Sequence, residues 1–457
     1  MKPLSFWALT TRQTYPNTLR EQHTVSTPTN PESSQAELAR NANYVLAVLF
    51  VVIMLNFLDR QIISILAEPI KQEMGLSDKQ IGLMTGLSFA LFYTTLDIPV
   101  AALADRWNRT KIIAIAVSIW SVMTMLCGAA GNFIQLFLAR VGVGIGESAS
   151  GPASHSLIAD YFPPERRAGA MGVYGAAVPF GAFIALAGGG WIVENFDWRV
   201  AFFVAGIPGL LVGLIVWLTV KEPRGAVSLR EAFEPQPDQL TFIAALKELW
   251  TQPTYWHLVA AGVLIQFVSY GIAAFYGSLY IRVFGIGYGE LGLKLGLMVA
   301  IAGMLGAWLG GKISDRIDRR SPGASLLIVA SVFLIATPST FAAVSVGNVN
   351  LSITLLGVTT FAATFYYGPN FSLLQALASD RTRAMAVAIY LLFAGLIGLG
   401  LGPVFVGTIS DYVSGGDQAL EAEGIRAGVA TISVFNIWTA FHFWRAQRRV
   451  KADAADS

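Results

Sequence analysis

Two stretches of the chain echo each other: ALADRWNRTK at residues 102–111 and KISDRIDRRS at residues 312–321. Each carries an Asp-Arg pair, at Asp105 and Asp315, and the two pairs are 210 positions apart. A single Asp-Arg pair is an ordinary feature of a solvated loop. A pair repeated in matching sequence context instead indicates an internal duplication.

A second echo has nearly the same offset. ERRAGAMGVY ends at Tyr174 and RTRAMAVAIY ends at Tyr390, which are 216 positions apart. Two independent landmarks at nearly one offset predict that the chain is built from two parallel halves. Transporters with such repeats bind their substrates near the membrane midplane, between the halves.

The composition indicates that both halves lie in a membrane. Residues of the AVILMFWYC class make up 54% and charged residues only 13%, where a soluble chain carries about 25% charged residues. The mean hydropathy is +0.57. Twelve apolar runs approach the roughly 20 residues that cross a bilayer: 43–67, 80–103, 112–130, 133–160, 168–193, 199–220, 254–282, 291–313, 324–345, 351–378, 384–411 and 427–444. The predicted fold is an all-α integral membrane protein with twelve transmembrane helices in two six-helix bundles.

The predicted organisation follows from these runs. We expect a flexible cytoplasmic tail over 1–42, bundles over 43–220 and 254–445, a cytoplasmic linker over 221–253, and a tail over 446–457. A short interfacial helix is predicted within the linker, around the sequence TFIAALKELW. Most of the 31 Lys and Arg residues fall on the side of the two tails, so the positive-inside rule predicts that both termini are cytoplasmic.

Ionisable residues deep in a membrane helix are costly and therefore serve a site or a partner. The first half carries Asp59, Arg60, Arg140 and Glu147 within its apolar runs. Arg140 and Glu147 are seven positions apart and share one helix face. We predict the pairs Arg60–Glu147 and Asp59–Arg140. A permanent structural salt bridge is the alternative, but a carboxylate beside arginine also suits proton coupling, with Asp59 ranked first and Glu147 second as the carrier.

The repeated loops predict a cytoplasmic gate. An Asp at a helix end can bind nearby arginines and the positive N-terminus of another helix, and such contacts would hold the cytoplasmic side shut in one state. Asp97, near the end of the second run, is expected to pair with gate arginines. The expected gate members are Asp105, Arg106, Arg109, Asp315, Arg316, Arg319, Arg167 and Arg383.

The second half carries aromatic residues where the first half carries charge. A charged wall opposite an aromatic wall suits an amphipathic or anionic substrate, with arginine holding the headgroup. The expected substrate-binding residues are Arg60, Arg140, Glu147, Tyr270, Tyr276, Phe365, Tyr366 and Tyr367.

These motifs resemble those of a known family. The core G-x-x-x-D-R-x-x-R is complete from Gly311 to Arg319, and it looks like the hallmark loop of the major facilitator superfamily; the first copy departs, with Ala101 in place of Gly. NFLDR at 56–60, DRWNR at 105–109 and RVGVGIGESAS at 140–150 resemble the spinster family, as a bacterial member. The resemblance implies a proton-coupled carrier in the bacterial inner membrane, and export of lysolipids or sphingoid-type lipid phosphates.

Other classes are disfavoured by the residues. The chain has no GxxxxGK[ST] run for ATP, and its one Cys and four His residues offer no catalytic set or metal cluster. A net charge of +2 gives no field for nucleic acid. We therefore expect a carrier that is not an enzyme, has no cofactor, works as a monomer, and has substrate, protons and membrane lipid as partners. A proton symporter of small organic anions and a drug/proton antiporter remain open alternatives.

Overall fold

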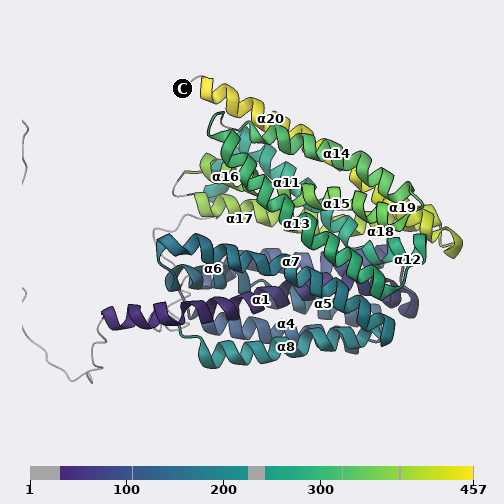
Figure 1. Ribbon diagram of the computed structural model, residues 1–457, viewed down its shortest axis with the longest axis horizontal. Helices are drawn as coiled ribbons and strands as arrows, with labels where there is room; N and C mark the ends of the chain where they lie inside the picture. Colours follow the sequence, from purple (N-terminus) through teal and green to yellow (C-terminus); the bar gives the residue numbers. More distant parts are fainter. Residues whose placement is uncertain (1–30, 105, 225–241, 322, 380–381, 456–457) are drawn as a thin grey trace, which may run out of the picture.

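Every regular element in the described part of the chain is a helix. The computed structural model describes all residues except 1–30, 105, 225–241, 322, 380–381 and 456–457 (Figure 1). The first-half elements are α1 (Pro31–Met74), α2 (Asp78–Gly82), η1 (Leu83–Leu87), α3 (Ser88–Ala104), α4 (Arg109–Ala129), α5 (Phe133–Glu147), α6 (Ser150–Tyr161), α7 (Pro164–Asn195) and α8 (Trp198–Thr219). The later elements are α10 (Phe242–Trp250), α11 (Pro253–Ala273), α12 (Tyr276–Phe284), α13 (Tyr288–Asp318), α14 (Ser325–Ser345), α15 (Val349–Phe365), α16 (Tyr367–Leu377), α17 (Arg383–Phe393), η2 (Ala394–Leu399), α18 (Gly400–Ser414), η3 (Gln418–Leu420), α19 (Glu421–Ser433) and α20 (Phe435–Ala455).

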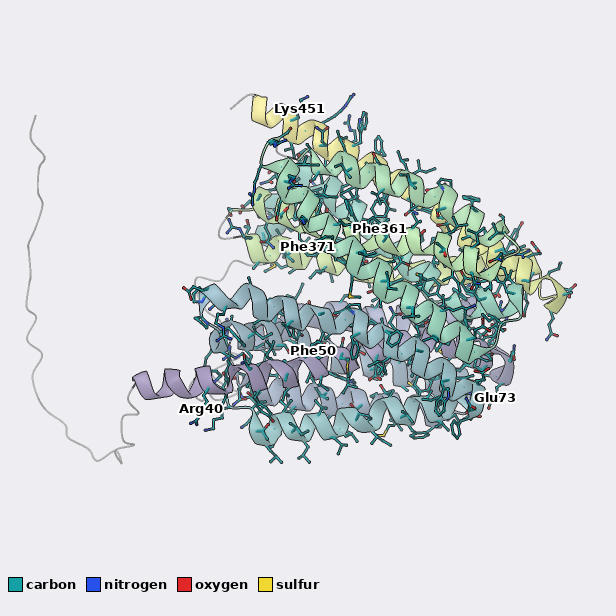
Figure 2. All side chains as sticks on the ribbon, viewed as in Figure 1. Arg40, Phe50, Glu73, Phe361, Phe371 and Lys451 are labelled. Atoms are coloured by element: carbon teal, nitrogen blue, oxygen red, sulfur yellow. The ribbon has the colours of Figure 1, made fainter. Side chains whose placement is uncertain are left out.

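The helices form two groups that follow the chain order. Helices α1 and α4 to α8 lie together in the lower part of Figure 1, and α11 to α20 lie in the upper part. Arg40 lies in the left part of α1 and Glu73 at its right end, while Lys451 of α20 lies toward the left (Figure 2). The described ends of α1 and α20 are therefore on the same side of the molecule.

Ten helical stretches in the described residues are long and apolar enough to cross a membrane. The fourth and twelfth predicted runs are absent from this set. The fourth is divided into α5 and α6, each shorter than 18 residues, whereas α20 in the twelfth has 21 residues but too many polar ones. The predicted helix within the linker is confirmed by α10. Helix α1 begins at Pro31, inside the range expected to be a flexible tail.

The breaks have local causes. Between α5 and α6, the Ser148 hydroxyl donates to the Ile145 carbonyl at 2.8 Å, which competes with the helical backbone pattern. Pro152 has no N–H to bond the carbonyl four residues earlier. Pro369 likewise has no N–H to bond the Phe365 carbonyl, and the helix is interrupted at Tyr366 between α15 and α16. Some runs whose hydropathy predicts one continuous helix are therefore divided into two shorter helices.

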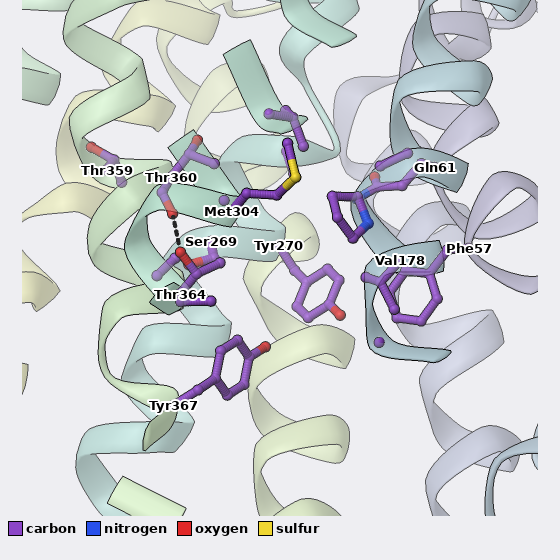
Figure 3. A pocket seen from close by; sticks show the side chains of 18 of the residues that line it. Phe57, Gln61, Val178, Ser269, Tyr270, Met304, Thr359, Thr360, Thr364 and Tyr367 are labelled. Atoms are coloured by element: carbon purple, nitrogen blue, oxygen red, sulfur yellow. Dashed lines mark hydrogen bonds between the residues drawn. The ribbon is translucent and has the colours of Figure 1, made fainter. Parts of the chain in front are cut away.

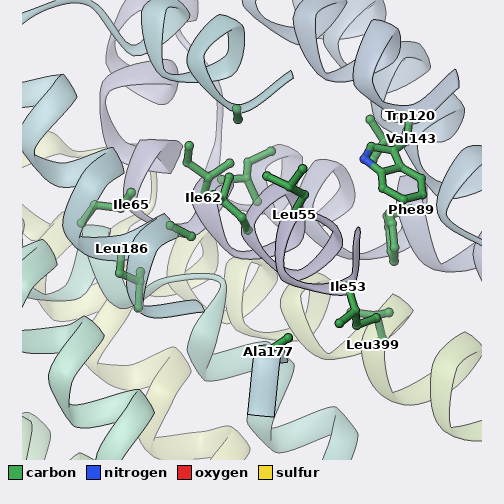
Figure 4. Close-up of a cluster of buried hydrophobic side chains, with 14 of the residues drawn as sticks. Ile53, Leu55, Ile62, Ile65, Phe89, Trp120, Val143, Ala177, Leu186 and Leu399 are labelled. Atoms are coloured by element: carbon green, nitrogen blue, oxygen red, sulfur yellow. The ribbon is translucent and has the colours of Figure 1, made fainter. Parts of the chain in front are cut away.

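Helix α1 is central to the core of the first half. Its Leu55, Ile62 and Ile65 are buried, and Figure 4 shows this cluster beside α3, α4, α5 and α7. Leu399 of η2, from the other half of the chain, also belongs to this cluster (Figure 4). The cluster also includes buried residues of α11, α12, α13, α18 and α19, so one core spans both groups of helices.

Small residues let the two groups approach closely. A Cβ added at Gly190 of α7 would meet the Tyr288 carbonyl oxygen of α13 and come within 3.1 Å of the Gly292 Cα. A Cβ at Gly86 would lie 2.6 Å from the Gly400 carbonyl oxygen. Close approach through small residues is how membrane helices commonly pack.

We expect Gly190→Ala to lower the thermal unfolding temperature of the purified protein. The added methyl group overpacks the α7–α13 contact, which typically costs about 1–3 kcal/mol. Gly169→Ala on the same helix is the matched control, because nothing lies within 4 Å of its added Cβ, and helix propensity favours Ala by about 1 kcal/mol. Tryptophan fluorescence during heating measures both; equal unfolding temperatures for the two variants would contradict this packing.

Candidate functional site

A buried ion pair joins α1 to α5 in the first half. Nη2 of Arg60 lies 2.8 Å from Oε2 of Glu147, with side-chain exposures of 8% and 0%. The same nitrogen donates to Oδ1 of Asn56 at 3.3 Å. The predicted pair Arg60–Glu147 is confirmed as a contact. The pair therefore joins α1 to α5, because each helix supplies the opposite charge for a buried ion on the other.

The second predicted pair does not form between side chains. Nη1 of Arg140 donates to the backbone carbonyl of Asp59 at 3.5 Å, and the Asp59 carboxylate accepts from the Thr124 hydroxyl at 3.1 Å instead. The other oxygen of Asp59 is buried without a hydrogen-bond partner within the described ranges. Arg140 therefore lies beside Asp59 but donates to its backbone carbonyl and not to its carboxylate.

Aromatic rings surround the Arg60 guanidinium. Its central carbon lies 4.5 Å from the Tyr93 ring centroid, 4.8 Å from Phe89 and 4.9 Å from Phe57. Arg140 lies 5.4 Å from the Phe89 centroid. Rings at these distances attract a cation through their faces, so the cluster keeps its two arginines in place with only one direct carboxylate contact.

A cavity of about 920 Å³ lies between the two groups of helices. Figure 3 shows Phe57, Gln61 and Val178 of the first half facing Tyr270 and Tyr367 of the second. Further lining residues include Gln266, Ser269, Tyr276, Met304, Trp308, Thr360 and Thr364. The wall is apolar and aromatic, with amides and hydroxyls at intervals, so the space suits an amphipathic molecule.

A smaller cavity of about 150 Å³ contains Arg60 and Asp97 in its wall. Gln266 and Tyr270 line both cavities and so connect the buried charge to the larger space. Asp97 was expected to pair with arginines of the gate. The structure instead places it in the small cavity with Arg60.

Two of the residues predicted to bind substrate, Phe365 and Tyr366, do not line the cavity. Phe365 packs against Phe361 with ring centroids 5.5 Å apart, and the Tyr366 hydroxyl bonds that of Tyr390 at 2.9 Å in the core of the second half. Tyr270, Tyr276 and Tyr367, in contrast, do line the cavity. Arg140 and Glu147 are buried behind the wall.

The predicted gate is not assembled as one group. Arg109 is buried and binds Asp160 at 2.6 Å and Glu222 within its own half. Arg167 donates to the Ala159 carbonyl at 2.6 Å, and Arg383 donates to the Gln375 carbonyl at 3.4 Å. Asp315, Arg316 and Arg319 line a separate surface hollow. The Arg106 backbone closes a turn on Leu103, and Asp105 lies outside the described residues.

A charged network that the sequence interpretation missed joins the two halves at the opposite end. Arg282 of α12 holds the Asp78 carboxylate through two nitrogens, at 2.7 and 2.8 Å, and it binds Glu68 of α1 at 2.7 Å. Lys71 bridges Asp78 at 3.0 Å and Glu421 of α19 at 2.7 Å. We call Glu68, Lys71, Asp78, Arg282 and Glu421 the ionic latch.

Backbone groups extend the latch. Both oxygens of Asp411 in α18 accept N–H groups from the start of α2, those of Asp78 and Lys79, each at 2.9 Å. The Ser410 hydroxyl donates to Asp78 at 2.6 Å. Three elements of the second half thus hold two elements of the first, and this end of the molecule is closed.

The described residues contain no group of three or more His, Cys, Asp or Glu side chains that could hold a metal ion. The site therefore consists of a buried charge cluster, an amphipathic cavity and a closed end.

Comparisons with known proteins agree with this architecture. The Major Facilitator Superfamily model matches residues 49–449. A bacterial homologue of the human lysosomal transporter spinster, in an inward-facing and unoccupied conformation, is 34% identical with a TM-score of 0.79, covering 89% of this chain and 97% of that one. An MFS-type efflux pump of Mycolicibacterium smegmatis is 32% identical over 91% of this chain and 94% of its own length. The chain therefore belongs to the major facilitator superfamily and, within it, to the spinster family of transporters.

Vertebrate relatives fit the same assignment. Spinster homolog 1 of Xenopus tropicalis is 27% identical over 82% of this chain and 74% of its own length. The protein is thus a multi-pass membrane transporter and not an enzyme.

We expect Arg282→Gln to open the latched end. Ser278, one turn before Arg282, is buried, so a Ser278→Cys reporter should react slowly with a membrane-impermeant maleimide. Breaking a buried ion pair costs about 3–5 kcal/mol, and labelling should therefore become at least about tenfold faster.

The matched control is Lys294→Gln, which breaks the exposed pair Lys294–Glu290. Exposed pairs contribute about 0–1 kcal/mol, so labelling should stay at the parental rate. Unchanged labelling in Arg282→Gln would contradict a latch that keeps this end closed.

Proposed function

We propose that the protein is a proton-coupled secondary transporter that works by alternating access and exports an amphipathic, lipid-like substrate of the lysolipid or sphingoid-phosphate type. It acts in a bacterial inner membrane with both termini in the cytoplasm. In this proposal the latched end is the non-cytoplasmic one, and the structure is the state in which that end is closed. The inward-facing conformation of the similar spinster homologue supports this assignment.

The proposal about the cargo rests on the residues that form the wall of the large cavity. Met304 and Trp308 line the cavity and are 51% and 59% exposed. Ile301 and Leu305 on the same helix are 53% and 47% exposed. Because α13 is long and apolar enough to span the membrane, this surface faces lipid, and the apolar lining of the cavity continues toward the bilayer. A cargo with an acyl chain fits such a wall.

The buried charges support proton coupling. One Asp59 oxygen and one Glu147 oxygen are buried without hydrogen-bond partners in the described structure. An ionised carboxylate without partners is strongly disfavoured in an apolar interior. Protonation of Asp59 removes that cost, and re-ionisation becomes favourable when Arg140 moves from the backbone carbonyl to the carboxylate. Proton uptake and release are thereby tied to movement of α1 against α5.

The direction of transport draws support from the efflux pump of Mycolicibacterium smegmatis. The alternative of a small organic anion draws support from the probable galactarate/D-glucarate transporter of Bacillus subtilis, which is 26% identical over 85% of this chain. A drug/proton antiporter is the second alternative. The apolar cavity wall favours the lipid-like cargo over a small, strongly hydrated anion.

Flux in proteoliposomes distinguishes these cargoes. Labelled lysolipid, labelled galactarate and a labelled cationic drug are each assayed with and without a pH gradient. We expect gradient-dependent flux for lysolipid, exceeding protein-free liposomes. Gradient-dependent flux of galactarate or of the drug, with none of lysolipid, would replace the proposed cargo by the corresponding alternative.

We expect Asp59→Asn to abolish the effect of the pH gradient on flux, because the amide resembles the protonated acid and cannot release a proton. Exchange of labelled for unlabelled cargo at equal pH should continue. Glu290→Gln, at an exposed carboxylate on α13, is the matched control and should retain the full effect. Gradient-driven flux in Asp59→Asn at the parental level would exclude this residue as the carrier.

A further inference from the structure

The two copies of the repeated loop have different electrostatic surroundings. In the first copy Arg109 is completely buried and binds two carboxylates. In the second copy Arg316, Arg319 and Arg320 are exposed, and no ion pair to them occurs within the described ranges. The duplicated sequence therefore provides a neutralised arginine in one half and uncompensated arginines in the other.

The second copy forms a hollow of about 400 Å³ at the end of α13. Its wall consists of Lys312, Asp315, Arg316, Arg319 and Arg320, so four cations face one carboxylate. We call these five residues the basic hollow.

The nearest other carboxylate in the sequence, Asp318, is already engaged. Its oxygens accept the Ser325 N–H at 2.9 Å, the Ser325 hydroxyl at 2.6 Å and the Ser314 hydroxyl at 2.9 Å. It closes the turn into α14 and leaves the basic hollow positive.

The neighbouring residues place the basic hollow at the membrane surface. Nζ of Lys312 lies 4.7 Å from the ring centroid of Trp308, and Trp308 is 59% exposed beside the apolar, exposed Leu305. Tryptophan is enriched at the level of lipid headgroups, and lysine near a helix end extends its ammonium toward the interface. The cations thus begin where the apolar surface of α13 ends.

We propose that the basic hollow binds the headgroup of an anionic phospholipid of the cytoplasmic leaflet. Arginines bind phosphate oxygens through paired N–H groups, and basic clusters directly beside a membrane helix bind anionic lipids. The adjoining Trp308 and Leu305 offer the acyl chains a contact that a free phosphate ion would not use. The basic hollow shares no lining residue with the central cavity, although the adjoining Trp308 also lines that cavity, and the proposal does not depend on which cargo is transported.

Thermal unfolding of the full chain in detergent tests the site. Phosphatidylglycerol, phosphatidylcholine and inorganic phosphate are titrated separately. We expect phosphatidylglycerol to raise the unfolding temperature and the other two to leave it unchanged. Equal stabilisation by phosphatidylcholine would overturn the headgroup assignment, and equal stabilisation by inorganic phosphate would overturn the assignment to a lipid.

The variant Arg316→Gln/Arg319→Gln should unfold at the parental temperature without lipid, because neither side chain has an ion-pair partner to lose among the described residues. Half-maximal stabilisation should require at least about tenfold more phosphatidylglycerol. The matched control is Arg448→Gln/Lys451→Gln on α20, where Arg448 likewise lies over a tryptophan, 4.3 Å from the Trp444 centroid. An unchanged response in the first variant, or an equal loss in both, would overturn the proposal.

Discussion

The contact between Arg60 and Glu147 is the constraint on which the rest of the site depends. Taking two such charges out of water costs several kcal/mol per ion, and only close pairing with further polar contacts offsets that cost. The chain supplies those contacts from Asn56 and from three aromatic rings. Because the pair joins α1 to α5, any movement that separates these helices exposes an unpaired charge. In the proposed mechanism, this electrostatic cost is what would couple movement of the helices to a change in protonation.

The two ends of the molecule differ in what connects the halves. At one end the ionic latch and close glycine contacts join α1, α2 and α7 to α12, α13, α18 and α19. At the other end the predicted gate residues bind within their own halves or line the basic hollow. The cavity lies between, with Gln266 and Tyr270 connecting it to the small cavity of Arg60. In the proposed alternating-access cycle, this arrangement is the state in which the latched end is closed.

The repeated loops and hydropathy predicted a duplicated membrane bundle, and the cost of burying charge predicted the contact between Arg60 and Glu147. The contacts between the two halves were not predicted. The latch was missed because Asp78 and Arg282 are about 200 positions apart and each reads as an ordinary loop charge. Phe365 and Tyr366 were expected in the cavity wall but pack in the core of the second half, because an aromatic residue in an apolar run does not reveal which face of the helix it occupies. The predicted gate residues with printed contacts are not joined in this conformation, and their contact in the state with a closed cytoplasmic end stays a prediction, because a repeated motif does not show which carboxylates surround each copy.

The most direct test of the account measures both ends of the molecule as the pH is lowered. Spin labels at Phe196 and Leu420 report the latched end, and labels at Glu165 and Ala376 report the cytoplasmic end. Both pairs are introduced with Cys127→Ser, since Cys127 is the chain's one cysteine. Electron–electron distance measurements should show the first pair separating and the second approaching on acidification, with neither change in Asp59→Asn. A parental response in Asp59→Asn, or no response to pH at either end, would contradict the coupling of protonation to movement of the halves.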